Sequence, residues 1–191
     1  MKFIKKIIAQ FILWVWGWKI VMEGPASNLE RCILVVAPHT ANDEYILGNL
    51  AYWVLDKKLK VIIKDAHTKA WYGFIVKGLG GIGIDRSQRN NLVKFVIDEF
   101  KKDDFSLVIT QEETRSWVPK WRKEFYNMAI EAKVPIVIAA GDFKNKTIHL
   151  GKQISVHDLE TRSFESIMQE LEDYYKTITP KYPEKWNPKI Y

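Results

Sequence analysis

The feature that most constrains the fold is a set of short apolar runs that alternate with stretches of helical periodicity. Runs rich in β-branched residues predict strands at 32–37, 60–64, 105–110 and 134–140, with a further edge strand at 147–150. A run that is apolar at every position is typical of a strand buried on both faces of a sheet. The intervening stretches predict helices at 44–55, 90–102, 121–132 and 163–176. This alternation indicates a single α/β domain with a mostly parallel central sheet flanked by helices.

Composition supports this fold class and narrows the partners. The chain has 191 residues, of which 47% are hydrophobic and 27% charged, a balance that suits one globular domain and excludes a disordered chain. A single cysteine, Cys32, excludes an internal disulfide and a cysteine-based zinc site, and no metal site is expected. The net charge of +6 favours anionic partners such as phosphates or acidic lipids. No nucleic-acid-binding module is recognised, so nucleic acid is not expected as a partner.

The N-terminal segment predicts a helix from about Lys2 to Met22, because no proline interrupts it before Pro25. Its uncharged run covers residues 7–18, which at ~1.5 Å per residue is roughly 18 Å long. That length is short of the ~30 Å hydrocarbon core of a bilayer. The segment is therefore not expected to span a membrane.

Lysines and tryptophans in this segment favour an interfacial membrane anchor. Lysine side chains can meet lipid phosphates while aromatic rings sink into the acyl boundary. The anchor residues that we expect are Lys5, Lys6, Trp14, Trp16 and Trp18. Residues 1–24 would then form an interfacial helix, and residues 25–191 the α/β domain. Two alternatives stay open: a secretory signal that ends near the small residues 24–26, and a core helix that caps the domain.

A compact polar cluster follows the first predicted strand, where ligands gather in parallel sheets. His39 lies there, and its ordinary pKa near 6.5 suits a general base. A neighbouring carboxylate would fix the imidazole tautomer and stabilise the imidazolium. Asp43 and Glu44 are both within reach by sequence, and either can serve. The alternative is a helix-capping cluster that holds a structural histidine.

Two later loops each place an arginine after a predicted strand or turn. The segment 78–87 has four glycines in six residues and then Arg86, whose guanidinium can clamp a phosphate. The segment 110–116 carries Glu112 and Arg115, a second possible phosphate ligand. Taken alone, the first is a glycine-rich turn with a surface arginine and the second a charged loop. Together with His39 they indicate phosphate binding near a base.

These blocks, in this order, resemble the glycerolipid acyltransferase family of PlsC-like 1-acylglycerol-3-phosphate acyltransferases. The family's blocks read His-x4-Asp, a glycine-rich block ending Asp-Arg, Glu-Gly-Thr-Arg, and Val-Pro-Ile. Here they correspond to His39 to Glu44, to the glycine-rich block ending at Arg86, to residues 112–115 and to the segment from Val134. The resemblance covers residues 33–140 and looks like the short bacterial members.

The resemblance implies acyl transfer from acyl-CoA or acyl carrier protein to the hydroxyl of a lysophospholipid, such as 1-acylglycerol-3-phosphate. His39 would be the general base, and no cofactor is needed beyond the thioester co-substrate. Arg86, Glu112, Thr114 and Arg115 would bind the acceptor and its phosphate, with Glu112 orienting Arg115. Membrane lipids would be partners, and the protein would lie peripherally on the cytoplasmic face of the membrane.

Two departures from the family pattern leave alternatives open. The first block has Glu44 where the family has Asp, and the third has Glu113 where the family has Gly. A charged side chain at position 113 would repel an acceptor phosphate. The alternatives are a catalytically degenerate homologue that binds lipid without chemistry, and an acyltransferase for an acceptor without a phosphomonoester, such as an aminoacyl lipid.

Overall fold

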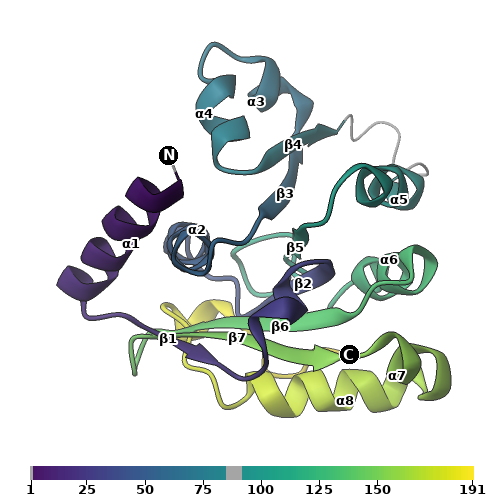
Figure 1. The fold of residues 1–191 in the computed structure, drawn as a ribbon. Coiled ribbons are helices and arrows are strands. Elements are labelled where there is room, and N and C mark those ends of the chain that lie inside the picture. The colour runs from purple at the N-terminus through teal and green to yellow at the C-terminus, as the bar shows by residue number, and fades with distance from the viewer. Residues whose placement is uncertain (1, 85–91) are drawn as a thin grey trace.

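Seven strands form one sheet in the order β1-β7-β6-β2-β5-β3-β4 (Figure 1). The computed structural model describes residues 2–84 and 92–191. All neighbouring strands are parallel except β6 and β7, which are antiparallel. The strands are β1 (Lys19–Met22), β2 (Cys32–Val36), β3 (Leu59–Lys64), β4 (Gly81–Ile84), β5 (Ser106–Ile109), β6 (Ile136–Asp142) and β7 (Thr147–Ile154).

Helices cover both faces of this sheet. The α-helices are α1 (Lys2–Trp16), α2 (Asp43–Leu55), α3 (Asp65–Lys69), α4 (Gly73–Gly78), α5 (Leu92–Lys102), α6 (Glu124–Ala132), α7 (Val156–Thr161) and α8 (Phe164–Tyr175). Short 3-10 turns lie at Ala26–Leu29 and Pro183–Lys185. The predicted α/β domain with a mostly parallel sheet flanked by helices is therefore confirmed.

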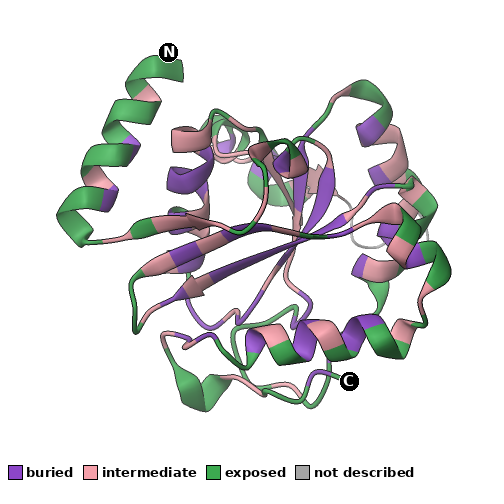
Figure 2. Ribbon diagram, turned by 60° about the horizontal axis from the view of Figure 1, so that its bottom comes forward, coloured by how far each residue is buried: buried purple, intermediate pink, exposed green. Residues whose placement is uncertain are grey.

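Alternate residues of the central strands feed two hydrophobic cores. In β2, Ile33 and Val35 pack with side chains of α5, α6 and α8. Cys32 and Leu34 point to the other face and pack with side chains of α1 and α2. Successive residues of a strand alternate between faces, so a strand covered on both sides must be apolar throughout, as this one is. In Figure 2 the strands at the centre of the sheet are accordingly coloured as buried.

The sheet has two strands that the sequence patterns did not predict, β1 and β4. β1 pairs in parallel with β7, so the predicted edge strand at 147–150 is not at an edge but lies between β1 and β6. β4 falls inside the glycine-rich block, where Gly81 and Gly83 alternate with isoleucines. Glycine weakens a strand pattern, and four residues are too few for a period to stand out.

The N-terminal helix ends earlier than predicted, at Trp16 rather than near Met22. Gly17 follows with φ +73°, the left-handed conformation that favours glycine. The N–H of Gly17 donates to Trp14 O at 3.1 Å, and that of Trp18 donates to Leu13 O at 2.8 Å. This pair of bonds is a Schellman motif, which closes the helix and directs the chain into β1.

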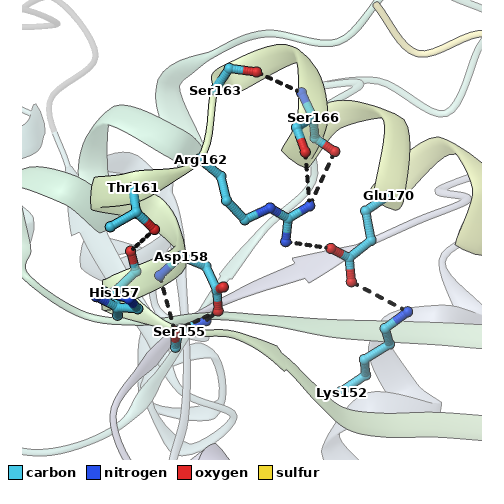
Figure 3. A network of polar contacts seen from close by, with 9 residues as sticks. All are labelled: Lys152, Ser155, His157, Asp158, Thr161, Arg162, Ser163, Ser166 and Glu170. Atoms are coloured by element: carbon cyan, nitrogen blue, oxygen red, sulfur yellow. Dashed lines mark hydrogen bonds and ion pairs between the residues drawn. The ribbon is translucent and has the colours of Figure 1, made fainter.

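Polar contacts fix the last two helices against the sheet (Figure 3). Ser155 begins α7 with a capping box, in which the N–H of Asp158 donates to Ser155 Oγ and Asp158 accepts from the Ser155 N–H. Ser163 caps α8 by accepting from the Ser166 N–H. Arg162 binds Glu170 at 2.7 Å. Glu170 of α8 also pairs with Lys152 of β7 at 3.5 Å. The helix α8 packs on the sheet face that lies opposite α1 and α2.

Candidate active site

His39 lies just beyond the carboxyl end of β2, the central strand of the sheet. Its ring Nδ1 is 2.7 Å from Glu44 Oε2, and its side chain is 20% exposed. Glu44 stands in the first turn of α2. The sequence left Asp43 and Glu44 open as partners of His39, and the structure brings Glu44 to the imidazole. Asp43 instead forms an ion pair with Lys181.

The Glu44 carboxylate is held by hydrogen bonds from the loop that precedes its helix. The backbone N–H groups of Thr40 and Ala41 each donate to Glu44 Oε1 at 2.9 Å, and the Thr40 hydroxyl donates at 3.2 Å. The Glu44 side chain is only 3% exposed. Because Oε1 is occupied by donors, Oε2 is aimed at His39, which donates from Nδ1 to the charged carboxylate. The other ring nitrogen, Nε2, is then the one that can accept a proton.

Glu112 stands in the loop after β5 and contacts the backbone of the same histidine. Its Oε1 accepts a hydrogen bond from the His39 N–H at 3.2 Å. Burial raises the pKa of Glu112 to about 7, although the hydrogen bonds from backbone N–H groups lower it. The atom Oε2 is buried and, within the described part of the chain, has no hydrogen-bond partner.

The predicted contact of Glu112 with Arg115 is wrong for the described residues. Glu112 is turned toward His39, while Arg115 donates to the side-chain oxygen of Asn42, the residue that precedes α2. Arg115 is exposed, as is Thr114, whose hydroxyl accepts from the Ser116 N–H at 3.3 Å. Arg115 therefore reaches the neighbourhood of His39 through Asn42. Arg86 lies outside the described residues.

Glu113 occupies a position that favours glycine. Its φ is +54°, in the left-handed region. Its carboxylate forms an ion pair with Arg122, at 3.1 Å from Oε2 to Nε. The cation beside it offsets the repulsion that the sequence predicted between Glu113 and an acceptor phosphate.

A largely apolar cavity of about 600 Å³ opens beside the histidine. His39, Glu44 and Thr110 are among the polar residues that line it. The rest is lined mainly by aliphatic side chains of the sheet and of the helices α2 and α4, among them Leu34, Val36, Leu47, Val76, Leu79 and Ile148. A volume of this size falls within the ~300–1,000 Å³ typical of small-molecule sites.

The C-terminal tail contributes contacts that the sequence did not suggest. Lys181 pairs with Asp43, and the Tyr182 N–H donates to the Thr40 hydroxyl at 3.4 Å. Farther along, the Asn187 side chain donates to Pro119 O at 2.9 Å. The tail thus holds the loop of His39 and the loop of Arg115. Because these partners are far apart along the chain, no local pattern could have predicted the contacts.

The predicted anchor residues divide into two groups. Trp14 and Trp16 are 76% and 45% exposed, and Lys6 is exposed as well. Lys5 instead stacks over the ring of Trp53 at 5.0 Å, and the ring of Trp18 packs edge-on against Phe143 at 5.0 Å. Among residues 2–84 and 92–191, no helix has the length and hydropathy that a membrane span requires. Over the same residues, no cluster of three or more histidine, cysteine or acidic side chains could hold a metal ion.

Comparison with known proteins shows likeness at the level of structure. No protein-family model matches the sequence, and no curated protein matches it. The crystal structure of the 1-acyl-sn-glycerophosphate acyltransferase PlsC from Thermotoga maritima is similar, with a TM-score of 0.62 at 16% sequence identity. The alignment covers 92% of this chain and 77% of that one. The chain therefore has the α/β fold of this acyltransferase, in accord with the resemblance found in the sequence.

Proposed function

We propose that the protein transfers an acyl group from a thioester, acyl-CoA or acyl carrier protein, to the hydroxyl of a lysophospholipid such as 1-acylglycerol-3-phosphate. The observation that carries this proposal is the His39–Glu44 pair in the wall of a largely apolar cavity. The fold shared with an acyltransferase of that class supports it.

The chemistry needs only a base and a positioned acceptor. Nε2 of His39 takes the proton of the acceptor hydroxyl as its oxygen attacks the thioester carbonyl. Glu44 holds the imidazole in the required tautomer and stabilises the imidazolium that forms. The carbon–sulfur bond then breaks, and the leaving thiolate takes the proton from His39. The products are a carboxylic ester and a free thiol, and no acyl-enzyme forms.

The apolar cavity suits the acyl chain, and the cation near it suits the acceptor phosphate. The aliphatic lining of the cavity suits an acyl chain, because burial of apolar surface is favourable. Arg115, exposed and bound to Asn42, supplies a cation for the acceptor phosphate, with Thr114 beside it and Arg86 as a further candidate. The ion pair of Glu113 with Arg122 removes the charge argument against a phosphate-bearing acceptor.

We propose further that the protein works peripherally, on the cytoplasmic face of a membrane. The outward face of α1 supports this, since Phe3, Phe11 and Trp14 are each more than 60% exposed. In Figure 2 the helix α1 is mostly coloured as exposed. Such a face is typical of a helix that lies in the membrane interface, where a lysolipid acceptor resides.

The experiment is thiol release from palmitoyl-CoA by the purified protein with vesicles, with and without lysophosphatidate. We expect release that depends on the lysolipid and is lost in His39→Ala. His149→Ala is a matched control, because His149 is also 20% exposed and its Nδ1 is 2.8 Å from Glu23 Oε1, but it does not line the cavity.

Equal turnover of His39→Ala and wild type would remove His39 from the mechanism. Lysophosphatidate binding without thiol release, by a protein that is correctly folded, would instead support the degenerate, lipid-binding alternative. Release with an aminoacyl lipid but not with lysophosphatidate would support the acceptor without a phosphomonoester.

A further inference from the structure

The short helices α3 and α4 expose a second set of large apolar side chains, separate from α1. Trp71, Phe74 and Ile75 are 86%, 71% and 50% exposed. Trp71 lies in the turn between the two helices, and the other two lie in the first turns of α4. Large aromatic side chains with this exposure mark a contact surface when they gather in one place.

The same helix forms a wall of the apolar cavity. Val76 and Leu79 of the α4 segment point inward and line the cavity beside His39, while Phe74 and Ile75 point outward. Two other lining residues are exposed, His67 of α3 and Ile46 of α2. Because residues that line the cavity are exposed there, the cavity opens to the surface between α2 and the α3–α4 pair. One short helix therefore separates the cavity from the exposed aromatic side chains.

The exposed faces of α1 and α4 flank one lysine-lined depression. It has a volume of about 300 Å³ and is lined by Lys2 and Lys5 of α1 and by Lys77 of α4, together with lysines at 57, 58 and 60 and one acidic residue, Asp56. Both helices lie on the sheet face of the core that contains Leu34 and Leu150. Figure 1 shows the N-terminal end of α1 and the α3–α4 pair on the same side of the molecule.

The charge of these two segments identifies the partner. α1 carries three lysines and no acidic residue, and residues 64–77 carry three lysines and one aspartate, Asp65. Within the described residues, Lys6 and Lys64 form no ion pair. Lys2 pairs with Asp56 and Lys69 with Asp65, but lysines outnumber acidic residues in both segments. Exposed aromatic side chains beside an excess of lysines complement an anionic lipid surface, in which phosphates lie above the acyl chains.

We propose that the α3–α4 pair is a second membrane-inserting element, which together with α1 sets the opening of the cavity against an anionic bilayer. The proposal rests on the proposed function in one respect: it gives an acyl chain a route from the bilayer into the cavity that ends at His39. The insertion itself is independent of catalysis, so it can be tested on a protein that shows no turnover.

The chain offers a clean way to test insertion at a single residue. Its one cysteine, Cys32, is fully buried, and burial raises the pKa of its thiol to about 12, so it does not react readily. A cysteine introduced by Phe74→Cys can therefore be labelled selectively with an environment-sensitive fluorophore. Trp14→Cys on α1 is the comparison for the first anchor. Ile130→Cys on α6, which covers the opposite face of the sheet, is the matched control.

With vesicles of phosphatidylethanolamine and phosphatidylglycerol, we expect a blue shift for labels at positions 74 and 14 and none at position 130. The double variant Trp71→Ser/Phe74→Ser, with α1 intact, should bind these vesicles at least about tenfold more weakly than the wild type. Both side chains are exposed, so this variant should keep the circular dichroism spectrum of the wild type. A shift at position 14 without one at 74 would overturn the proposal, as would unchanged binding by the double variant. These results would leave the thiol-release assay unaffected, so failure of either proposal is recognised separately.

Discussion

The Glu44→Gln variant tests whether the carboxylate selects the tautomer of His39. In the wild type, Oε1 accepts from the N–H groups of Thr40 and Ala41, and Oε2 faces His39 Nδ1 at 2.7 Å. A glutamine must place its carbonyl oxygen toward those two N–H donors, because an amide NH2 there would leave donors facing donors. Its NH2 group then faces Nδ1, which must accept. The proton is thereby moved to Nε2, and the histidine can no longer act as a base.

The size of the effect follows from the contacts. Restoring the base-competent tautomer in the variant loses one hydrogen bond between neutral groups, worth about 0.5–1.5 kcal/mol, and leaves a buried donor unpaired for about 1–3 kcal/mol more. A combined cost of about 2–4 kcal/mol corresponds to a loss of roughly 30- to 10³-fold in turnover. We expect this loss in thiol release at pH 7, with near-native circular dichroism.

Asp43→Asn is the neighbouring control, because Asp43 pairs with Lys181 and not with His39. We expect its turnover to stay within about fivefold of the wild type, since an exposed ion pair is worth only about 0–1 kcal/mol. Turnover of Glu44→Gln within about threefold of the wild type would refute the tautomer argument. So would a larger loss in Asp43→Asn than in Glu44→Gln.

Three further predictions concern stability and the cavity. Burial raises the pKa of Glu112 from 4.5 to about 7, so the folded state holds a proton that the unfolded state releases between these values. The free energy of unfolding of the wild type should therefore fall by at most ~3 kcal/mol as pH rises through this window. Denaturation at pH 5 and pH 8 should show this fall in the wild type and not in Glu112→Gln. Equal falls in the wild type and in Glu112→Gln would contradict the prediction. Gly48 lines the cavity, and a Cβ there would meet nothing within 4 Å. The ring of Gly48→Phe should therefore fill part of the cavity and shift the preference in thiol release toward shorter acyl-CoA. An unaltered chain-length profile would count against the cavity as the acyl site. Gly17→Ala forces φ +73° on a residue with a Cβ and should lower the free energy of unfolding by about 1–2 kcal/mol in urea titrations, whereas an unchanged midpoint would show that the Schellman turn adds little.

Patterns that depend on neighbours in sequence predicted the fold well. The strands β2, β3, β5 and β6 are buried on both faces or flanked by helices, so each appears as a short apolar run. The pairing of β1 with β7 joins residues 19–22 to residues 147–150, and nothing within either segment signals the other. The helix end at Gly17 carried a signal, a glycine near the end of the uncharged run 7–18, which the prediction of a longer helix overlooked.

In the candidate site, too, contacts between neighbours in sequence were predictable and contacts between distant residues were not. His39 and Glu44 lie five residues apart, so their pairing follows from a strand end and the first turn of the next helix. The contact of Glu112 with the His39 N–H joins residues 73 apart, and it was mistaken for a local contact with Arg115. The ion pair of Lys181 with Asp43 spans 138 residues and depends on where the C-terminal tail lies in the folded chain. Contacts of this kind are properties of the packed chain.

Glu113 shows how a departure from a family pattern becomes interpretable once the backbone is known. The sequence indicates only that a glycine has been replaced by an acid beside candidate phosphate ligands. The backbone explains the family's glycine, because φ at this position is +54°, a conformation that costs a residue with a Cβ roughly 1–2 kcal/mol. The side chain bears on the proposed anionic acceptor, because its charge is matched by Arg122. The replacement therefore has two consequences, backbone strain and one ion pair, and Arg122→Ala tests the ion pair. If Arg122 screens the charge of Glu113, this variant should raise the KM for lysophosphatidate more than the KM for palmitoyl-CoA. Adding Glu113→Gly to the Arg122→Ala protein should then reverse the change. An equal rise for both substrates, or no reversal, would show that Glu113 does not act on the acceptor through its charge.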